Sequence, residues 1–74
     1  QLVLSPNPCS DLVFFQTPIL LERIEVLNSM GKVVQVEENT SSIGYVDLTQ
    51  LPSGTYTLIL HASKGQFVRK LVKL

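Results

Sequence analysis

Two side chains of this 74-residue sequence could act together as a nucleophile and its base, the single cysteine and the single histidine. A cysteine thiol activated by a neighbouring histidine is a recurrent arrangement in hydrolases. Cys9 follows a Pro-Asn-Pro turn, whereas His61 lies far along the chain in an expected strand, and no Cys-His enzyme signature surrounds either. We therefore expect no catalysis, with Cys9 a small half-buried residue and His61 a solvent-facing one.

Cation binding is the other chemistry that the residue types suggest. Glu37, Glu38 and Asp47 carry the oxygen ligands that calcium prefers, but the Asp-x-Asp-x-Asp-Gly spacing of a calcium loop is missing. One histidine cannot build a zinc site alone. Asp11 and Asp47 lie beside turns and are expected to accept hydrogen bonds from local amides. The sequence thus predicts no metal and no cofactor.

Positive charge is concentrated near the C-terminus of the chain. Residues 63–74 hold four basic side chains and no acidic one, whereas residues 1–62 hold two basic and six acidic ones. The basic segment either pairs with the acidic body or is presented to an acidic partner. Nucleic acid is a poor candidate for that partner, because Phe67 is the lone aromatic residue nearby and the net charge of the chain is zero.

The composition is that of a small folded domain. Hydrophobic residues make up 45% and charged residues 16% of the chain, and its single cysteine cannot close an internal disulfide. No apolar run has the roughly 18 residues of a membrane-spanning helix. Because the chain starts at Gln1 with neither Met nor a signal peptide, residues 1–74 are expected to be one domain from the interior or the end of a longer protein.

Short runs rich in Val, Ile, Leu, Phe, Tyr and Thr alternate with turn-forming residues along the whole chain. This rhythm predicts an all-β fold, a sandwich or a barrel. Of the two we expect an immunoglobulin-like antiparallel β-sandwich of about seven strands. The expected strands are 2–5, 11–16, 22–28, 32–38, 43–48, 54–62 and 66–73. Period-two alternation predicts that one set of side chains faces inward: Leu12, Phe14, Ile24, Val26, Val34, Val36, Tyr56, Leu58 and Leu60.

The segments between the strands have interpretable turn chemistry. Gly31 is expected to adopt a positive φ in a hairpin that begins at Asn28. Pro6 and Pro8 lack amide donors, so the first strand should end there and the chain should cross over. The last strand has no clean face. Either a bulge lies between Val68 and Leu71, or this is an edge strand whose outer face something else covers.

Four segments occur in a characteristic order: SPNPCSDLVF, IEVLNSMGKVV, VDLTQLPSGTYTLIL and KGQFVRKLVKL. In this order they resemble the C-terminal sorting domain of type IX secretion cargo from Bacteroidetes, the Por secretion tail, over essentially the whole chain. Cys9 departs from the small residue, such as alanine, that is usual there. The matching motif residues are Pro6, Asn7, Pro8, Gly31, Val34, Leu51, Pro52, Gly54 and Tyr56, and the matching recognition tail is Lys70, Leu71, Val72, Lys73 and Leu74.

The resemblance implies a transport address rather than an enzyme. A folded cargo in the periplasm would be led through the outer membrane by type IX translocon components that read the tail. A sortase-like cysteine peptidase on the cell surface would then remove the domain. The cargo would lie upstream and end at the outer-membrane surface or outside the cell, and a gingipain-type protease is the first expectation for it.

Two other functions stay open. An immunoglobulin-like adhesion or carbohydrate-binding module needs an exposed aromatic platform, for which the chain offers Tyr45, since Tyr56 is expected to face inward. A structural spacer is the second alternative. Because the last strand follows a flexible turn at 63–65, two copies are also expected to exchange it and form a homodimer.

Overall fold

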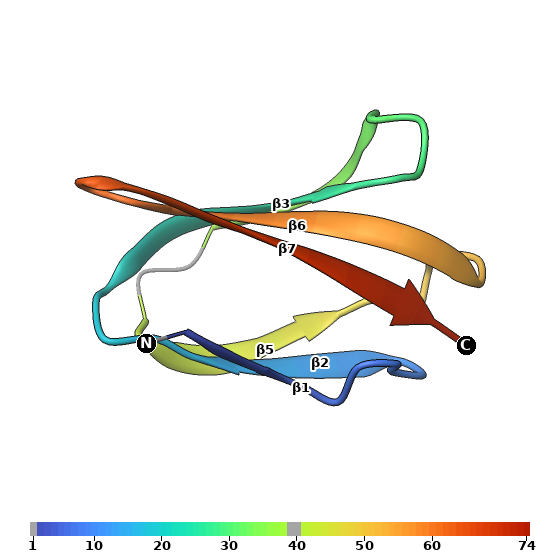
Figure 1. Cartoon of the computed structure of the whole chain (residues 1–74), viewed down its shortest axis with the longest axis horizontal. Coiled ribbons are helices and arrows are strands. Elements are labelled where there is room, and N and C mark those ends of the chain that lie inside the picture. Colours follow the sequence, from blue (N-terminus) through green and yellow to red (C-terminus); the bar gives the residue numbers. More distant parts are fainter. Residues whose placement is uncertain (1, 39–40) are drawn as a thin grey trace.

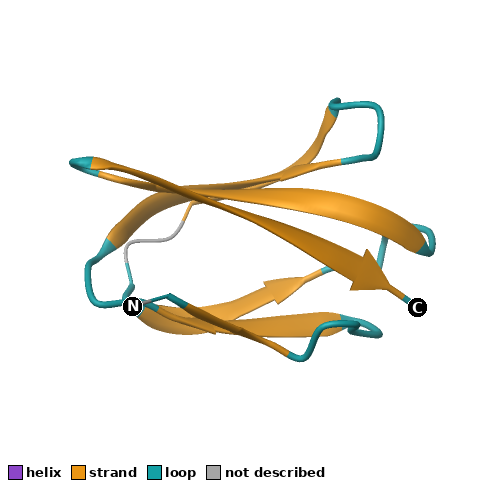
Figure 2. Cartoon of the chain, in the orientation of Figure 1, coloured by secondary structure: helices purple, strands orange, loops and turns teal. Residues whose placement is uncertain are grey.

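The observed strands begin and end almost at the residues that the turn-forming segments of the sequence predict. The computed structural model describes residues 2–38 and 41–74, and Figure 2 shows strands joined by short loops. No helix in these two ranges could span a membrane. The strands are β1 (Val3–Ser5), β2 (Leu12–Gln16), β3 (Leu21–Leu27), β4 (Val33–Glu38), β5 (Ile43–Asp47), β6 (Gly54–Ala62) and β7 (Gly65–Lys73). Each predicted strand end lies within one residue of the observed end.

Two antiparallel sheets pack face to face (Figure 1). One sheet has the order β1-β2-β5 and the other the order β4-β3-β6-β7. Pairing between β6 and β7 is the longest, running from Gly54 opposite Lys73 to Ala62 opposite Gly65. The prediction of a seven-stranded β-sandwich is confirmed.

The core lies between the sheets and is built from alternate residues of each strand. Its fully buried side chains include Val13 and Phe15 of β2, Ile24 and Val26 of β3, and Leu58 of β6. Burial of Tyr56 and Leu60 is also as predicted.

The inward face was predicted wrongly for β2 and only in part correctly for β4. In β2, Phe14 is 50% exposed and Leu12 half-buried, because Val13 and Phe15 point inward instead. In β4, Val34 packs against the core as predicted, although it is only half-buried, whereas Val36 is exposed. This strand lies at the sheet edge, and its pairing with β3 shifts register beside Leu27, which breaks the simple alternation.

The chain does not cross over after the first strand. That strand ends at Ser5, as predicted, but it pairs with β2 in the same sheet, with Leu4 opposite Phe15. Both the Ser5–Pro6 and the Asn7–Pro8 peptide bonds are cis. It is the loop from Pro6 to Asp11 that reaches the other sheet, through hydrogen bonds to the end of β7.

The hairpin between β3 and β4 has the expected turn. Gly31 has a φ of +83°, a left-handed conformation that side chains other than glycine adopt rarely. Its amide donates to the carbonyl of Asn28 at 2.9 Å, and the Asn28 side-chain oxygen accepts from the amides of Met30 and Lys32. The glycine prediction is confirmed.

Candidate functional site

The last strand, β7, forms one edge of the four-stranded sheet. Its pairing with β6 continues over nine residue pairs without a shift in register, so the predicted alternative of a bulge between Val68 and Leu71 is wrong. The position of β7 at the edge of the sheet is as the other alternative predicted. The inward face of β7 carries both basic and apolar side chains, namely Phe67, Arg69, Leu71 and Lys73. Long cationic side chains can lie there because their stems pack against apolar neighbours.

The five tail residues divide between the two faces of this strand. Leu71 and Lys73 point inward and are 1% and 8% exposed, respectively. Lys70, Val72 and Leu74 are exposed. The Lys73 ammonium nitrogen lies 4.0 Å from a carboxylate oxygen of Asp11, which places a cation of the basic tail on the acidic body.

The Pro-Asn-Pro motif lies against the tail, although more than sixty residues separate the two in the sequence. In Figure 1 the end of β7 descends towards the loop between β1 and β2. The Asn7 side-chain amide donates to the carbonyl of Lys70 at 3.2 Å and accepts from the amide of Val72 at 3.1 Å. The Cys9 amide donates to the carbonyl of Val72 at 2.9 Å, and the amide of Leu74 donates to the Cys9 carbonyl at 2.8 Å.

The third motif also adjoins the tail. Gly54 and Tyr56 of β6 are register partners of Lys73 and Leu71. The Tyr56 hydroxyl donates to the carbonyl of Pro52, so the buried ring ties the preceding turn to the strand. A tyrosine that bonds to backbone a few residues upstream is a known way to fix a corner in β-sandwiches. Leu51 ends a separate turn that begins at Leu48, because its amide donates to the carbonyl of Leu48 at 3.0 Å.

The middle motif is not part of this site. Gly31 and Val34 belong to the β3–β4 hairpin, and β4 is the edge opposite β7 in the same sheet. The structure therefore brings the first and third motifs together at the tail and leaves the second one apart.

Cys9 and His61 are not close enough to react together. Cys9 was expected to be half-buried, but it is only 1% exposed and lies beside Lys73. His61 is the register partner of Gln66 at the other end of the β6–β7 hairpin. Burial raises the pKa of the Cys9 thiol, although the charge of Lys73 acts against that rise. His61 was expected to face solvent, but it is half-buried and its Nε2 lies 2.7 Å from a carboxylate oxygen of Glu25.

The carboxylates have local structural roles. Within residues 2–38 and 41–74, no group of three or more potential metal ligands comes together. Asp47 accepts hydrogen bonds from the hydroxyl and the amide of Thr49, which lower the pKa of its carboxyl group, and the prediction for this residue is confirmed. Asp11 differs from its prediction, because the neighbour of its side chain is Lys73 and not a local amide.

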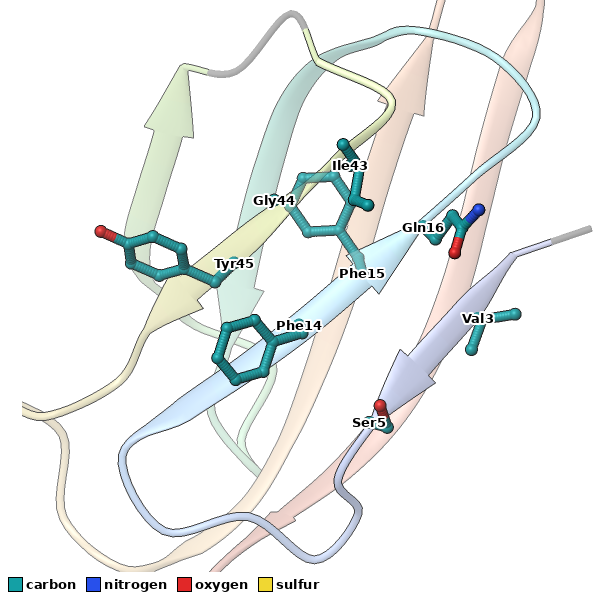
Figure 3. Close-up of a pocket in the computed structure, with 8 residues that line it drawn as sticks. All are labelled: Val3, Ser5, Phe14, Phe15, Gln16, Ile43, Gly44 and Tyr45. Atoms are coloured by element: carbon teal, nitrogen blue, oxygen red, sulfur yellow. The ribbon is translucent and has the colours of Figure 1, made fainter.

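Sequence reasoning missed an exposed aromatic pair on the outer face of the smaller sheet (Figure 3). Phe14 and Tyr45 are register partners on β2 and β5, with ring centroids 6.1 Å apart and planes inclined at 56°. A shallow hollow of about 310 Å³ adjoins them, with Val3 and Ile43 also in its lining. The adjacent residues Phe14 and Phe15 were the available signal, because one of two consecutive strand residues must face outward.

Comparison with known proteins agrees with this geometry. The profile of one protein family, described as the secretion system C-terminal sorting domain, matches residues 4–74. The comparison with curated proteins gives no match. Because the profile covers nearly the whole chain, including the Pro-Asn-Pro motif and the tail, the chain belongs to the family of secretion system C-terminal sorting domains, the non-catalytic type IX signals for translocation across the outer membrane.

Proposed function

We propose that the tail, Lys70 to Leu74, is the segment that an outer-membrane component of the type IX translocon reads. Membership of the family already implies contact with the type IX machinery and a cargo that is secreted or displayed at the cell surface. The observation that supports the tail as the contact is its presentation: Lys70, Val72 and Leu74 are exposed on a strand that Leu71 and Lys73 anchor. A partner surface with acidic groups beside apolar ones would fit these three side chains.

In this proposal the rest of the domain is a holder for the tail. The motif residues that adjoin the tail or fix the turn beside it are Pro6, Asn7, Pro8, Leu51, Pro52, Gly54 and Tyr56. Gly31 and Val34 shape the far edge of the sheet and act on folding rather than on recognition.

The route and the parent follow from the resemblance. Residues 1–74 would be the C-terminal part of a larger secreted protein of Bacteroidetes, with a gingipain-type protease as the first candidate for the cargo domain upstream. The folded precursor would pass from the periplasm through the translocon, and a sortase-like cysteine peptidase would remove the domain at the surface. Mass spectrometry of the periplasmic and surface forms of the precursor tests both the parent and the removal.

A carbohydrate-binding or adhesion module is the second candidate, because Phe14 and Tyr45 supply exposed aromatic rings after all. Sugar rings stack on flat aromatic platforms, however, and two rings inclined at 56° do not share a plane. The geometry therefore favours the sorting function over sugar binding.

Fusion to an inert reporter separates these functions. We expect a reporter that carries a signal peptide and residues 1–74 to reach the surface or the medium of a cell with a type IX system, and to stay in the periplasm without residues 70–74. Immunoblots of the cell fractions measure the distribution. Periplasmic retention of the intact fusion, together with binding to a glycan array, would support the module and overturn the proposal.

We also propose that two copies can exchange β7 and form a homodimer. Residues Ser63 and Lys64 form the short connection between β6 and β7, with Ala62 opposite Gly65. An exchanged β7 would keep its pairing with β6 and its contacts with Asn7 and Cys9, now in the partner copy. Strand exchange of this kind costs little because the same bonds form in both states.

Deletion of Ser63 and Lys64 is expected to convert the domain into a dimer at every accessible concentration, because β7 could no longer fold back on its own β6. The intact domain should show a dimer fraction that rises with concentration. Size-exclusion chromatography with light scattering measures both. A deletion variant that is folded and monomeric would show that strand exchange does not occur.

A further inference from the structure

The outer edge of β7 is occupied unevenly along its length. Residues of an antiparallel strand alternate between those that bond to the neighbouring strand and those whose amide and carbonyl point away from it. The bonds of Val72 and Leu74 to the loop residues Asn7 and Cys9 show that the even-numbered residues of β7 point away from β6. These positions are the ones that an added strand would use.

The Pro6–Cys9 segment already fills these positions at the end of the strand. Cys9 forms a parallel bridge with Lys73, because its amide bonds to the carbonyl of Val72 and its carbonyl to the amide of Leu74. The side-chain amide of Asn7 repeats the pattern two residues earlier, since it donates to the carbonyl of Lys70 and accepts from the amide of Val72. In a parallel ladder the amide and the carbonyl of one backbone residue would make the same two contacts around Leu71.

Asparagine suits this place for a chemical reason. The flanking residues Pro6 and Pro8 have no amide hydrogen and cannot donate to β7. Among the short side chains, only that of asparagine carries a donor and an acceptor on one planar amide, so it can take the place of the amide and the carbonyl of one backbone residue. An aspartate has the same shape but has no donor for the carbonyl of Lys70.

The beginning of the same edge lacks such cover. Gln66 and Val68 also point away from β6, and among the described residues no acceptor faces the amide of either one. The carbonyl of Val68 is bonded by the guanidinium of its neighbour Arg69 at 2.9 Å. The two halves of one strand therefore differ in their protection.

We propose that the Pro6–Cys9 segment is a clasp that occupies the backbone bonding positions of Lys70 to Leu74 and closes this part of the β7 edge to strand addition. A partner that meets the tail then contacts the outward side chains of Lys70, Val72 and Leu74 and not the backbone. The clasp is a property of the folded domain, and it stands or falls independently of what reads the tail.

Amide hydrogen exchange of the isolated domain, followed residue by residue by NMR, tests the clasp. In the unmodified protein, the amides of Val72 and Leu74 should exchange slowly, while those of Gln66 and Val68 exchange fast. The variant Asn7→Asp loses the bond to the carbonyl of Lys70 and sets a carboxylate oxygen against that carbonyl, so the Pro6–Cys9 segment should separate from β7 more often. Exchange at Val72 and Leu74 should then be faster by about three- to tenfold relative to the buried Leu58 amide, the range for the loss of one hydrogen bond. Referring the rates to Leu58 removes any change in global stability.

Asn28→Asp is the matched control. Asn28 uses only its side-chain oxygen, which accepts from Met30 and Lys32, so aspartate preserves both bonds. This variant should leave exchange at Val72 and Leu74 unchanged. If Val72 and Leu74 exchange as fast as Gln66 and Val68 in the unmodified protein, or if the two variants behave alike at the tail, the clasp does not exist.

Discussion

The variant Phe15→Ala is expected to lose about 3–5 kcal/mol of unfolding free energy. The Phe15 ring is 2% exposed and belongs to the core between the two sheets. A domain of this length has a total stability of about 4–11 kcal/mol, so the loss removes a large part of it. The melting temperature should fall by about 15 °C or more. Thermal and urea unfolding followed by circular dichroism measure both quantities.

Phe14→Ala is the control for this prediction, because it removes the same side chain from the neighbouring residue. Phe14 is 50% exposed and touches Tyr45 on the outer face. Its loss should cost about 1 kcal/mol at most, the worth of an exposed aromatic pair. Equal losses for the two variants, or a larger loss at Phe14, would show that the face of β2 has been assigned wrongly.

This pair of residues also shows where sequence reasoning reached its limit. The strand ends were predictable because Gly, Pro, Asn and Ser interrupt the apolar runs at short intervals. The side chains of β2 that face the core were not predictable, because residues 12–15 are all apolar and either alternate set could point inward. Pairing with β5 decides it, since Phe15 is the register partner of Gly44 on the inward side.

The tail posed a different difficulty. The inward face of a strand usually carries apolar residues, but Lys73 points inward. It is tolerated there because its aliphatic stem is buried and the carboxylate of Asp11 lies near its ammonium group. The contacts of Asn7 with the tail span more than sixty residues of sequence, and a local pattern of apolar and polar residues cannot predict a contact between such distant segments. The order of the motifs indicated that these segments belong together but not that they touch.

Lys70→Glu is expected to reduce export of the reporter fusion by at least about tenfold, which corresponds to about 1.4 kcal/mol of lost recognition. Lys70 is the exposed cation of the tail, and a glutamate there would add repulsion from an acidic partner to the lost attraction. Lys70→Ala should have a smaller effect because it removes the attraction alone. The exported fraction of each fusion is read from immunoblots of medium and periplasm.

Lys64→Glu gives the matched control, since Lys64 is also exposed but lies in the turn at the other end of β7. It changes the net charge by the same amount and should leave export near the unmodified level.

Lys73→Glu should also reduce export, but because the domain is destabilised. It places a second carboxylate beside Asp11 in a nearly buried position, so its melting temperature should fall together with export. Recognition by the tail therefore requires that Lys70→Glu melts normally and is retained in the periplasm. If Lys70→Glu and Lys64→Glu are exported alike, the positive charge of the tail is not what the translocon reads.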